Sequence, residues 1–140
     1  MRRLVLAGVA MLLVACGGDK TTGIETVSGT YTLRTVNGTA VPTTVYQDSQ
    51  EKDELLGGNV TLGADNSWSG LLSIRATEMS SGSVFGGTYP IGGTYSLSGN
   101  TITLTDSPDL LSFTGTVSGG TLTIGGDIGL GMTTAFVYQK

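Results

Sequence analysis

The sequence of 140 residues contains no histidine, one cysteine and three prolines, and only 13% of its residues are charged. Without histidine, catalytic triads that use an imidazole base and metal sites with imidazole ligands are excluded. A single cysteine allows no intramolecular disulfide, so burial and sheet hydrogen bonds must stabilise the fold. Acidic residues outnumber basic residues by 11 to 7, which argues against binding to nucleic acid.

The acidic residues and the glycine-rich segments show no catalytic or cofactor-binding motif. Asp48, Glu51, Asp53 and Glu54 lie close together, but their spacing is not that of a calcium-binding loop, and we interpret residues 48–54 as a charged, solvated loop. Residues 125–131 are rich in glycine, but no amphipathic helix follows them, so they are interpreted as a hairpin loop. We therefore expect no enzyme, no cofactor and no metal site.

The N-terminal residues follow the pattern of a secretory signal peptide. Arg2 and Arg3 precede an apolar segment at residues 4–14, which is too short to cross a bilayer as a stable helix. The motif Leu-Val-Ala-Cys at residues 13–16 resembles a bacterial lipobox, in which the cysteine receives a diacylglycerol and the chain is cut just before it. The alternative for Cys16 is an ordinary buried or unpaired thiol. The resemblance implies a signal peptide at residues 1–15 and a lipid anchor on Cys16.

A lipid anchor would hold the domain at a membrane surface. Anchoring by two acyl chains is effectively stable, because each buried methylene contributes about 0.8 kcal/mol. Residues 16–28 are small and polar, and they are interpreted as the acylated cysteine followed by a flexible tether. Gly17 stands where many lipoproteins carry an inner-membrane retention aspartate, so the resemblance favours the outer membrane of a bacterial envelope. Loss of Arg2 and Arg3 with the leader would lower the net charge by two, from −4 to −6.

From residue 29 onward, apolar residues alternate with serine and threonine, which is typical of half-buried antiparallel strands. Ile102 and Leu104, for example, share one face of a segment whose other face is threonine. Turns such as Asn37-Gly38 separate the segments. The strands expected from this pattern cover residues 29–36, 60–62, 68–74, 93–97, 101–105, 111–117, 121–124 and 133–138. A short strand is also expected between the Asn37-Gly38 turn and Pro42, and residues 43–47 form either another strand or its bent continuation.

Two segments do not follow the alternation. Leu55 and Leu56, after the charged segment, suggest a helical turn or plug. Residues 75–87 contain Val84 and Phe85, which suggest a strand, but the run Ser80-Ser81-Gly82 interrupts it. We interpret both segments as irregular connections.

A chain of eight to ten short strands, each with one apolar face, can close into a barrel or fold as a sandwich. Tight hairpins between neighbouring strands favour the barrel. We therefore predict an all-β fold, a small antiparallel up-and-down β-barrel that forms one domain over residues 29–140.

Several short motifs resemble those of bacterial lipocalin-like lipoproteins. They are Gly29-Thr30-Tyr31, Asn37-Gly38, Gly93-Thr94-Tyr95 and Phe136-Val137-Tyr138. The lipocalin family opens on Gly-x-Trp, and here Tyr31 takes the place of the tryptophan. The resemblance implies a lipocalin-like barrel that holds a small apolar molecule, such as a lipid, in its mouth.

Large aromatic residues on the apolar faces are the candidates for the barrel interior. They either form an ordinary core or line a ligand pocket. They are Tyr31, Trp68, Tyr95, Phe113 and Phe136.

Two functions remain open on this basis. The first is a membrane-anchored carrier or sensor of a small apolar ligand. The second is a ligand-free envelope module or inhibitor, which would contact a protein partner through the loops expected at residues 48–54 and 75–87. The partner is not identified by the sequence, and we expect the protein itself to be a monomer.

Overall fold

The computed structural model describes residues 26–127 and 133–140, which form antiparallel strands. In this part of the chain no helix is long and apolar enough to cross a membrane. The predicted signal peptide and Cys16 lie outside the described residues. The strands are β1 (Gly29–Val36), β2 (Thr39–Ala40), β3 (Thr43–Gln47), β4 (Glu51–Leu62), β5 (Ser67–Glu78), β6 (Val84–Ser98), β7 (Thr101–Asp106), β8 (Ser112–Ser118), β9 (Thr121–Asp127) and β10 (Thr133–Gln139).

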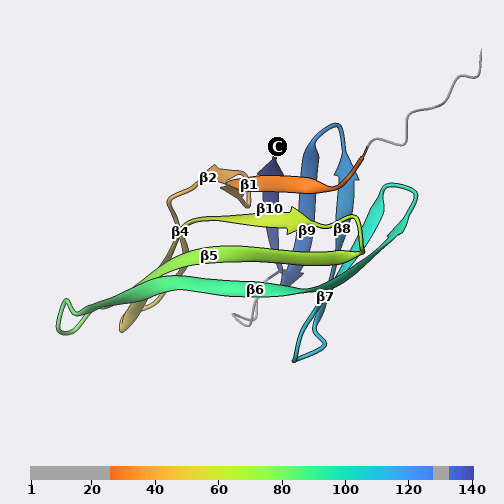
Figure 1. Ribbon diagram of the computed structural model, residues 1–140. Coiled ribbons are helices and arrows are strands. Elements are labelled where there is room, and N and C mark those ends of the chain that lie inside the picture. The colour runs from red at the N-terminus through yellow and green to blue at the C-terminus, as the bar shows by residue number, and fades with distance from the viewer. Residues whose placement is uncertain (1–25, 128–132) are drawn as a thin grey trace, which may run out of the picture.

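Eight of these strands close into an antiparallel barrel (Figure 1). The strands from β4 to β10 pair in sequence order, β10 pairs with β1, and β1 returns to β4 through the register from Gly29↔Leu62 to Thr32↔Asn59. β2 adds to β1, and β3 adds to the part of β4 that β1 does not reach. The predicted all-β, up-and-down barrel is confirmed.

Three strands are longer than expected. β4, β5 and β6 contain 12, 12 and 15 residues, and they run past the barrel as a curved sheet, to the left in Figure 1. We call this part the sheet extension. It consists of β3 with residues 51–58 of β4, 72–78 of β5 and 84–92 of β6.

The two segments predicted as irregular connections belong largely to these strands, so those predictions are wrong. β4 begins at Glu51, so residues 51–54 of the predicted charged loop belong to a strand, and that prediction is also wrong for them. β4 continues through Leu55 and Leu56, with no helical turn. β5 continues to Glu78 and β6 begins at Val84, so only the turn between them interrupts the sheet. The alternation in β4 is obscured because a bulge between Leu55 and Gly57 shifts its register by one residue.

The inward-facing side chains form one core inside the barrel. The buried residues mostly follow the alternation predicted from the sequence, but Leu55, which was predicted in a helical turn, is buried as well. The buried residues are Tyr31, Leu33, Val36, Leu55, Val60, Leu62, Trp68, Tyr95, Ile102, Leu104, Val117, Leu122, Ile124, Phe136 and Tyr138. A chain that begins at Gly17 therefore retains every pairing and core contact described here.

Inward-facing glycines allow the strands to coil tightly around this core. A Cβ at Gly115 on β8 would overlap the backbone carbonyl oxygen of Thr123 on β9. A Cβ at Gly93 on β6 would likewise overlap the carbonyl of Thr105 on β7. Because a backbone carbonyl cannot swing aside as a side chain can, the barrel requires glycine at these two positions.

Replacing Gly115 by alanine should therefore destabilise the barrel by about 1–3 kcal/mol, the usual cost of forcing an extra methyl group into a packed interior. Urea unfolding of residues 17–140 measures this. Gly125→Ala is the matched control, because a Cβ at Gly125 meets only the carbonyl of Thr114 at 3.8 Å. Equal stabilities of the two variants would contradict the proposed close approach of β8 and β9.

Candidate functional site

One end of the barrel is covered by the residues that flank the strands. The Tyr31 hydroxyl donates to the carbonyl of Val27 at 2.6 Å. Lys140 donates from Nζ to the carbonyl of Thr26 at 2.8 Å, and the same Nζ lies 5.0 Å from the centre of the Tyr31 ring. These contacts leave Tyr31 only 1% exposed. The aromatic ring therefore belongs to the core at this end.

The opposite end contains an apolar cavity of about 270 Å³ that is partly open to solvent. It lies where β7 ends and β8 begins, next to the sheet extension. Four aromatic side chains, several aliphatic side chains and one carboxylate surround it. The lining residues are Val60, Trp68, Leu72, Ile91, Leu104, Asp106, Leu111, Phe113, Ile124, Phe136 and Tyr138.

Only a few polar groups line this cavity. Burial raises the pKa of the Tyr138 hydroxyl to about 12, so this side chain stays neutral. Asp106 follows Ile102 and Leu104 on the inner face of β7, and its Oδ1 accepts the backbone N–H of Ser107 at 2.9 Å. Asp106 is the only charged residue among the described residues that line the cavity. The site therefore presents an apolar wall with a single negative charge.

The tryptophan of this wall is held by a long-range hydrogen bond. Trp68 on β5 pairs with Gly93 on β6, yet its Nε1 donates to the carbonyl of Thr105 on β7 at 3.1 Å. The indole can reach across β6 because glycine has no side chain there. Trp68 is consequently fixed in place and only 5% exposed.

The cavity brings together three of the five aromatic residues predicted for the interior. Trp68, Phe113 and Phe136 line it. Tyr95 does not, because its hydroxyl donates to the carbonyl of Gly63 at 2.7 Å, and Tyr31 lies at the covered end. For these two, the alternative of an ordinary core residue holds.

Several lining residues were not predicted. Ile91 belongs to the segment whose strand character was obscured by the glycines around it. Asp106 was not predicted because the strand was expected to end at residue 105, whereas β7 and its alternation of Ile102 and Leu104 continue to residue 106. Leu111 lies at the edge of the opening and is 55% exposed.

The inner face of the sheet extension continues from this opening. Leu72 and Ile74 on β5 stand opposite Tyr89 and Gly87 on β6, and they follow the same alternation as Trp68. Further out, Phe85 on β6 stands opposite Ala76. Phe85 and Tyr89 are 63% and 51% exposed, so apolar surface extends from the cavity onto the extension.

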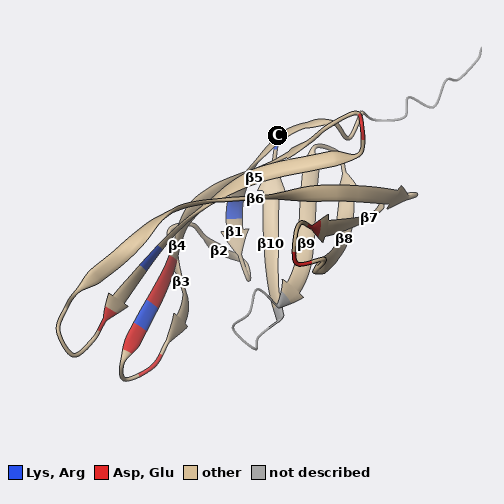
Figure 2. Ribbon diagram, turned by 60° about the horizontal axis from the view of Figure 1, so that its bottom comes forward, with Lys and Arg blue, Asp and Glu red and all other residues tan. Residues whose placement is uncertain are grey.

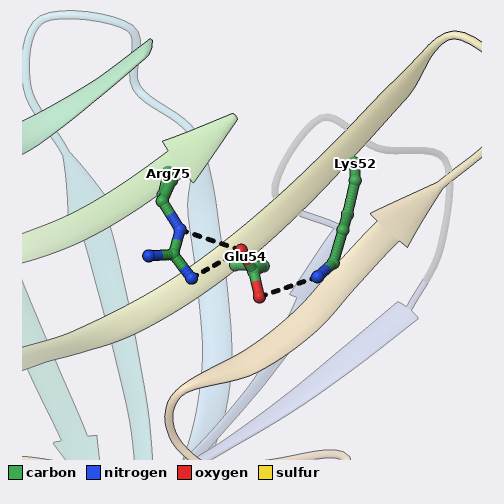
Figure 3. Close-up of polar contacts among 3 residues, drawn as sticks. All are labelled: Lys52, Glu54 and Arg75. Carbon is green, nitrogen blue, oxygen red and sulfur yellow. Dashed lines mark hydrogen bonds and ion pairs between the residues drawn. The ribbon is translucent and has the colours of Figure 1, made fainter. Parts of the chain in front are cut away.

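The outer face of the extension is polar and carries an ion-pair network (Figure 3). Glu54 on β4 accepts from Lys52 Nζ at 3.0 Å and from Arg75 Nε at 2.9 Å. These hydrogen bonds, that of Lys52 first, lower the pKa of Glu54. Figure 2 shows that charged residues gather on the two projecting hairpins. The extension is therefore amphipathic.

The acidic cluster considered as a cation site is dispersed by the fold. Asp48 Oδ1 accepts the backbone N–H groups of Gln50 and Glu51, both at 2.7 Å, and these bonds lower the pKa of Asp48. Glu54 points into the ion-pair network on the other face of β4. Among the described residues no three acidic side chains are grouped to hold a metal ion.

Comparisons of this chain with protein-family models, with curated proteins and with solved structures find no match. The resemblance to lipocalin-like lipoproteins therefore remains a prediction, and the function must be argued from the barrel and its cavity.

The ion-pair network predicts a dependence of stability on pH. Since the pKa of Glu54 in the folded chain is below its ordinary value of 4.5, the folded chain binds fewer protons than the unfolded chain in this range. The stabilisation is present above pH 4.5 and is lost as the pH falls through the folded pKa. We expect Glu54→Gln to flatten the acid loss of stability below pH 4.5, measured by urea unfolding from pH 3 to pH 7. If stability falls equally below pH 4.5 in both proteins, the ion-pair network does not stabilise the fold.

Proposed function

We propose that this protein is a membrane-anchored bacterial envelope lipoprotein whose barrel binds a small apolar molecule in the cavity beside Trp68, Phe113 and Phe136. The observation that carries the proposal is the cavity itself. The cavity is lined almost entirely by apolar side chains and opens to solvent, as sites for small apolar molecules usually do.

The cavity volume sets the size of the ligand. A cavity of about 150 Å³ lined by apolar side chains is known to hold benzene. By the same proportion, the present volume of about 270 Å³ accommodates roughly ten non-hydrogen atoms. Longer molecules would have to leave through the opening beside Leu111 and lie along the inner face of the sheet extension.

The charge of the lining selects the head group. Asp106 lies at this end of the barrel, and no basic side chain among the described lining residues offsets it. An anionic head group would be repelled in a setting where water is partly excluded. The proposed ligand is therefore a neutral apolar molecule rather than a fatty acid anion.

Titration of residues 17–140 with 1-decanol tests ligand binding, because Trp68 is the only tryptophan of the chain and reports directly from the cavity wall. We expect a saturable change in tryptophan fluorescence with a Kd of about 1–100 µM, a range typical of a ligand of this size. Decanoate at neutral pH should bind at least tenfold more weakly. No saturable signal with either compound would contradict the proposal.

A pair of neighbouring variants separates the cavity from general surface effects. Leu111→Asp places a charge at the opening and should weaken 1-decanol binding by about tenfold, since most of the burial of one leucine side chain is lost. Leu110→Asp is the control, because Leu110 is 75% exposed and does not line the cavity. Equal effects of the two variants would show that the signal does not come from this cavity.

The membrane anchor rests on the lipobox-like sequence at residues 13–16. Expression of the full chain in a bacterium should give a protein that fractionates with membranes and carries acyl chains on Cys16. Cys16→Ser should abolish acylation and cleavage before residue 16, as measured by mass spectrometry of the N-terminal peptide. Normal processing of that variant would rule out the lipoprotein assignment.

A further inference from the structure

One stretch of the sheet has an open edge. β6 pairs with β5 from Val84 to Thr94, but β7 pairs only with its last part, from Gly93 to Ser98. On the β7 side no described strand pairs with residues 84–92 of β6. This long edge lies along the lower margin of the extension in Figure 1.

The hydrogen bonds around β6 show which of its residues face this edge. Tyr95 N donates to Asn66 on the β5 side, whereas Gly92 accepts from Ser107 on the β7 side. The register with β5 is unbroken from Val84 to Thr94, so the sides alternate strictly along the strand. Residues with even numbers therefore present their backbone groups to the open edge.

Of the residues that face the open edge, the three central ones are Gly86, Thr88 and Pro90. Gly86 and Thr88 each offer an N–H and a carbonyl, and Pro90 offers a carbonyl alone. The missing N–H of Pro90 faces outward, so it costs no hydrogen bond to β5. The open edge can therefore pair with another strand, although it offers one N–H donor fewer than an edge without proline.

Apart from Pro90, the edge lacks the usual protection against pairing. Exposed edge strands normally carry charged residues, yet none of the 15 residues of β6 is charged. Val84, Phe85 and Tyr89 are instead 60%, 63% and 51% exposed. An uncharged apolar edge of this length is typical of a strand that pairs with another chain.

We propose that the open edge of β6 pairs with the same edge of a second copy of this chain, antiparallel and with Thr88 on the two-fold axis. In this register the two Thr88 residues exchange both of their backbone hydrogen bonds. Gly86 stands opposite Pro90 of the second copy, and its N–H donates to the carbonyl of that proline. Each Pro90 therefore removes one hydrogen bond from its own pair with Gly86 and breaks no other pair.

The side chains in this register are complementary. On the inner face, Tyr89 stands opposite Gly87 of the second copy, so a large ring lies beside a residue without a side chain. Phe85 stands opposite Ile91 of the second copy, a favourable pair of an aromatic and a β-branched side chain. No like charges meet, because the strand has none.

The loop after β7 adds to the same surface. Ser107 N binds Gly92 O at 3.0 Å, which places this loop at the end of the open edge. Leu110 and Leu111, which are 75% and 55% exposed, therefore lie beside the position that Val84 of the second copy would occupy. Over two copies these exposed side chains provide on the order of 1,000 Å² of buried area, the lower limit for a specific interface.

Light scattering coupled to size-exclusion chromatography of residues 17–140, from about 1 to 100 µM, tests this proposal. We expect a dimer that dissociates on dilution. Thr88→Lys brings two like charges together on the axis and should give a monomer at every concentration. Thr94→Lys is the matched control, because Thr94 is exposed on the same face of β6 but already pairs with β7, and this variant should remain dimeric.

Disulfide trapping gives a second measurement that does not depend on the charged variants. Residues 17–140 contain no cysteine, so Thr88→Cys introduces a single thiol. Directly opposite residues of an antiparallel pair lie close enough for a disulfide, and we expect rapid crosslinking of the two copies under mild oxidation. A monomer throughout the concentration range, or crosslinking no faster than that of Thr94→Cys, would overturn the proposal. Ligand binding in the cavity is tested separately, by the titration with 1-decanol.

Discussion

The pairing of β1 with β4 is the constraint on which the rest of the structure depends. Four residue pairs, from Gly29↔Leu62 to Thr32↔Asn59, close the sheet into a barrel. Because β4 has 12 residues and β1 occupies only its last four, the remainder of β4 must leave the barrel. β5 and β6 follow it through their own pairing, and the sheet extension results. One strand thus determines both the closed core and the open sheet.

Because β4 belongs partly to the barrel and partly to the sheet extension, the two ends of the barrel differ. At one end, Val27 and Lys140 contact Tyr31 and complete the core. At the other end, half of the wall continues outward as the extension and no equivalent residues among those described cover the opening. The apolar face that would be core in a symmetrical barrel is therefore only partly buried at Leu72 and Ile74, and it is exposed at Tyr89 and Phe85. A cavity and an uncovered edge are direct consequences of unequal strand lengths.

The sequence predicted the barrel because its period of two is unambiguous in segments such as residues 101–105, where every second residue is buried. It did not predict the extension. The charges of Lys52 and Glu54 satisfy each other on an outer sheet face, but in the sequence they are indistinguishable from a solvated loop. The bulge at Leu55 shifted the alternation as well. Local patterns report which face is buried, whereas strand length depends on pairing with distant residues.

Only part of the candidate site could be predicted from the sequence, and the reason is related. Trp68, Phe113 and Phe136 were identified as interior residues from alternation and size, but alternation does not reveal which interior residues border a void. That depends on the glycines of neighbouring strands, as Gly93 shows by making room for the indole of Trp68. Tyr31 and Tyr95 have the same sequence signal and are core residues. Cavities are a property of the assembled barrel.

The measurement that tests the central claim most directly is native mass spectrometry of residues 17–140, secreted into a bacterial periplasm and purified without detergent. The account predicts an added mass that is reproducible, lost on denaturation and small enough for the cavity of about 270 Å³. If part of the purified protein carries no added mass, the account predicts that this part takes up a neutral apolar compound when one is offered. A bare mass that remains unchanged when such compounds are offered would contradict the account, because the cavity would then have no ligand to hold.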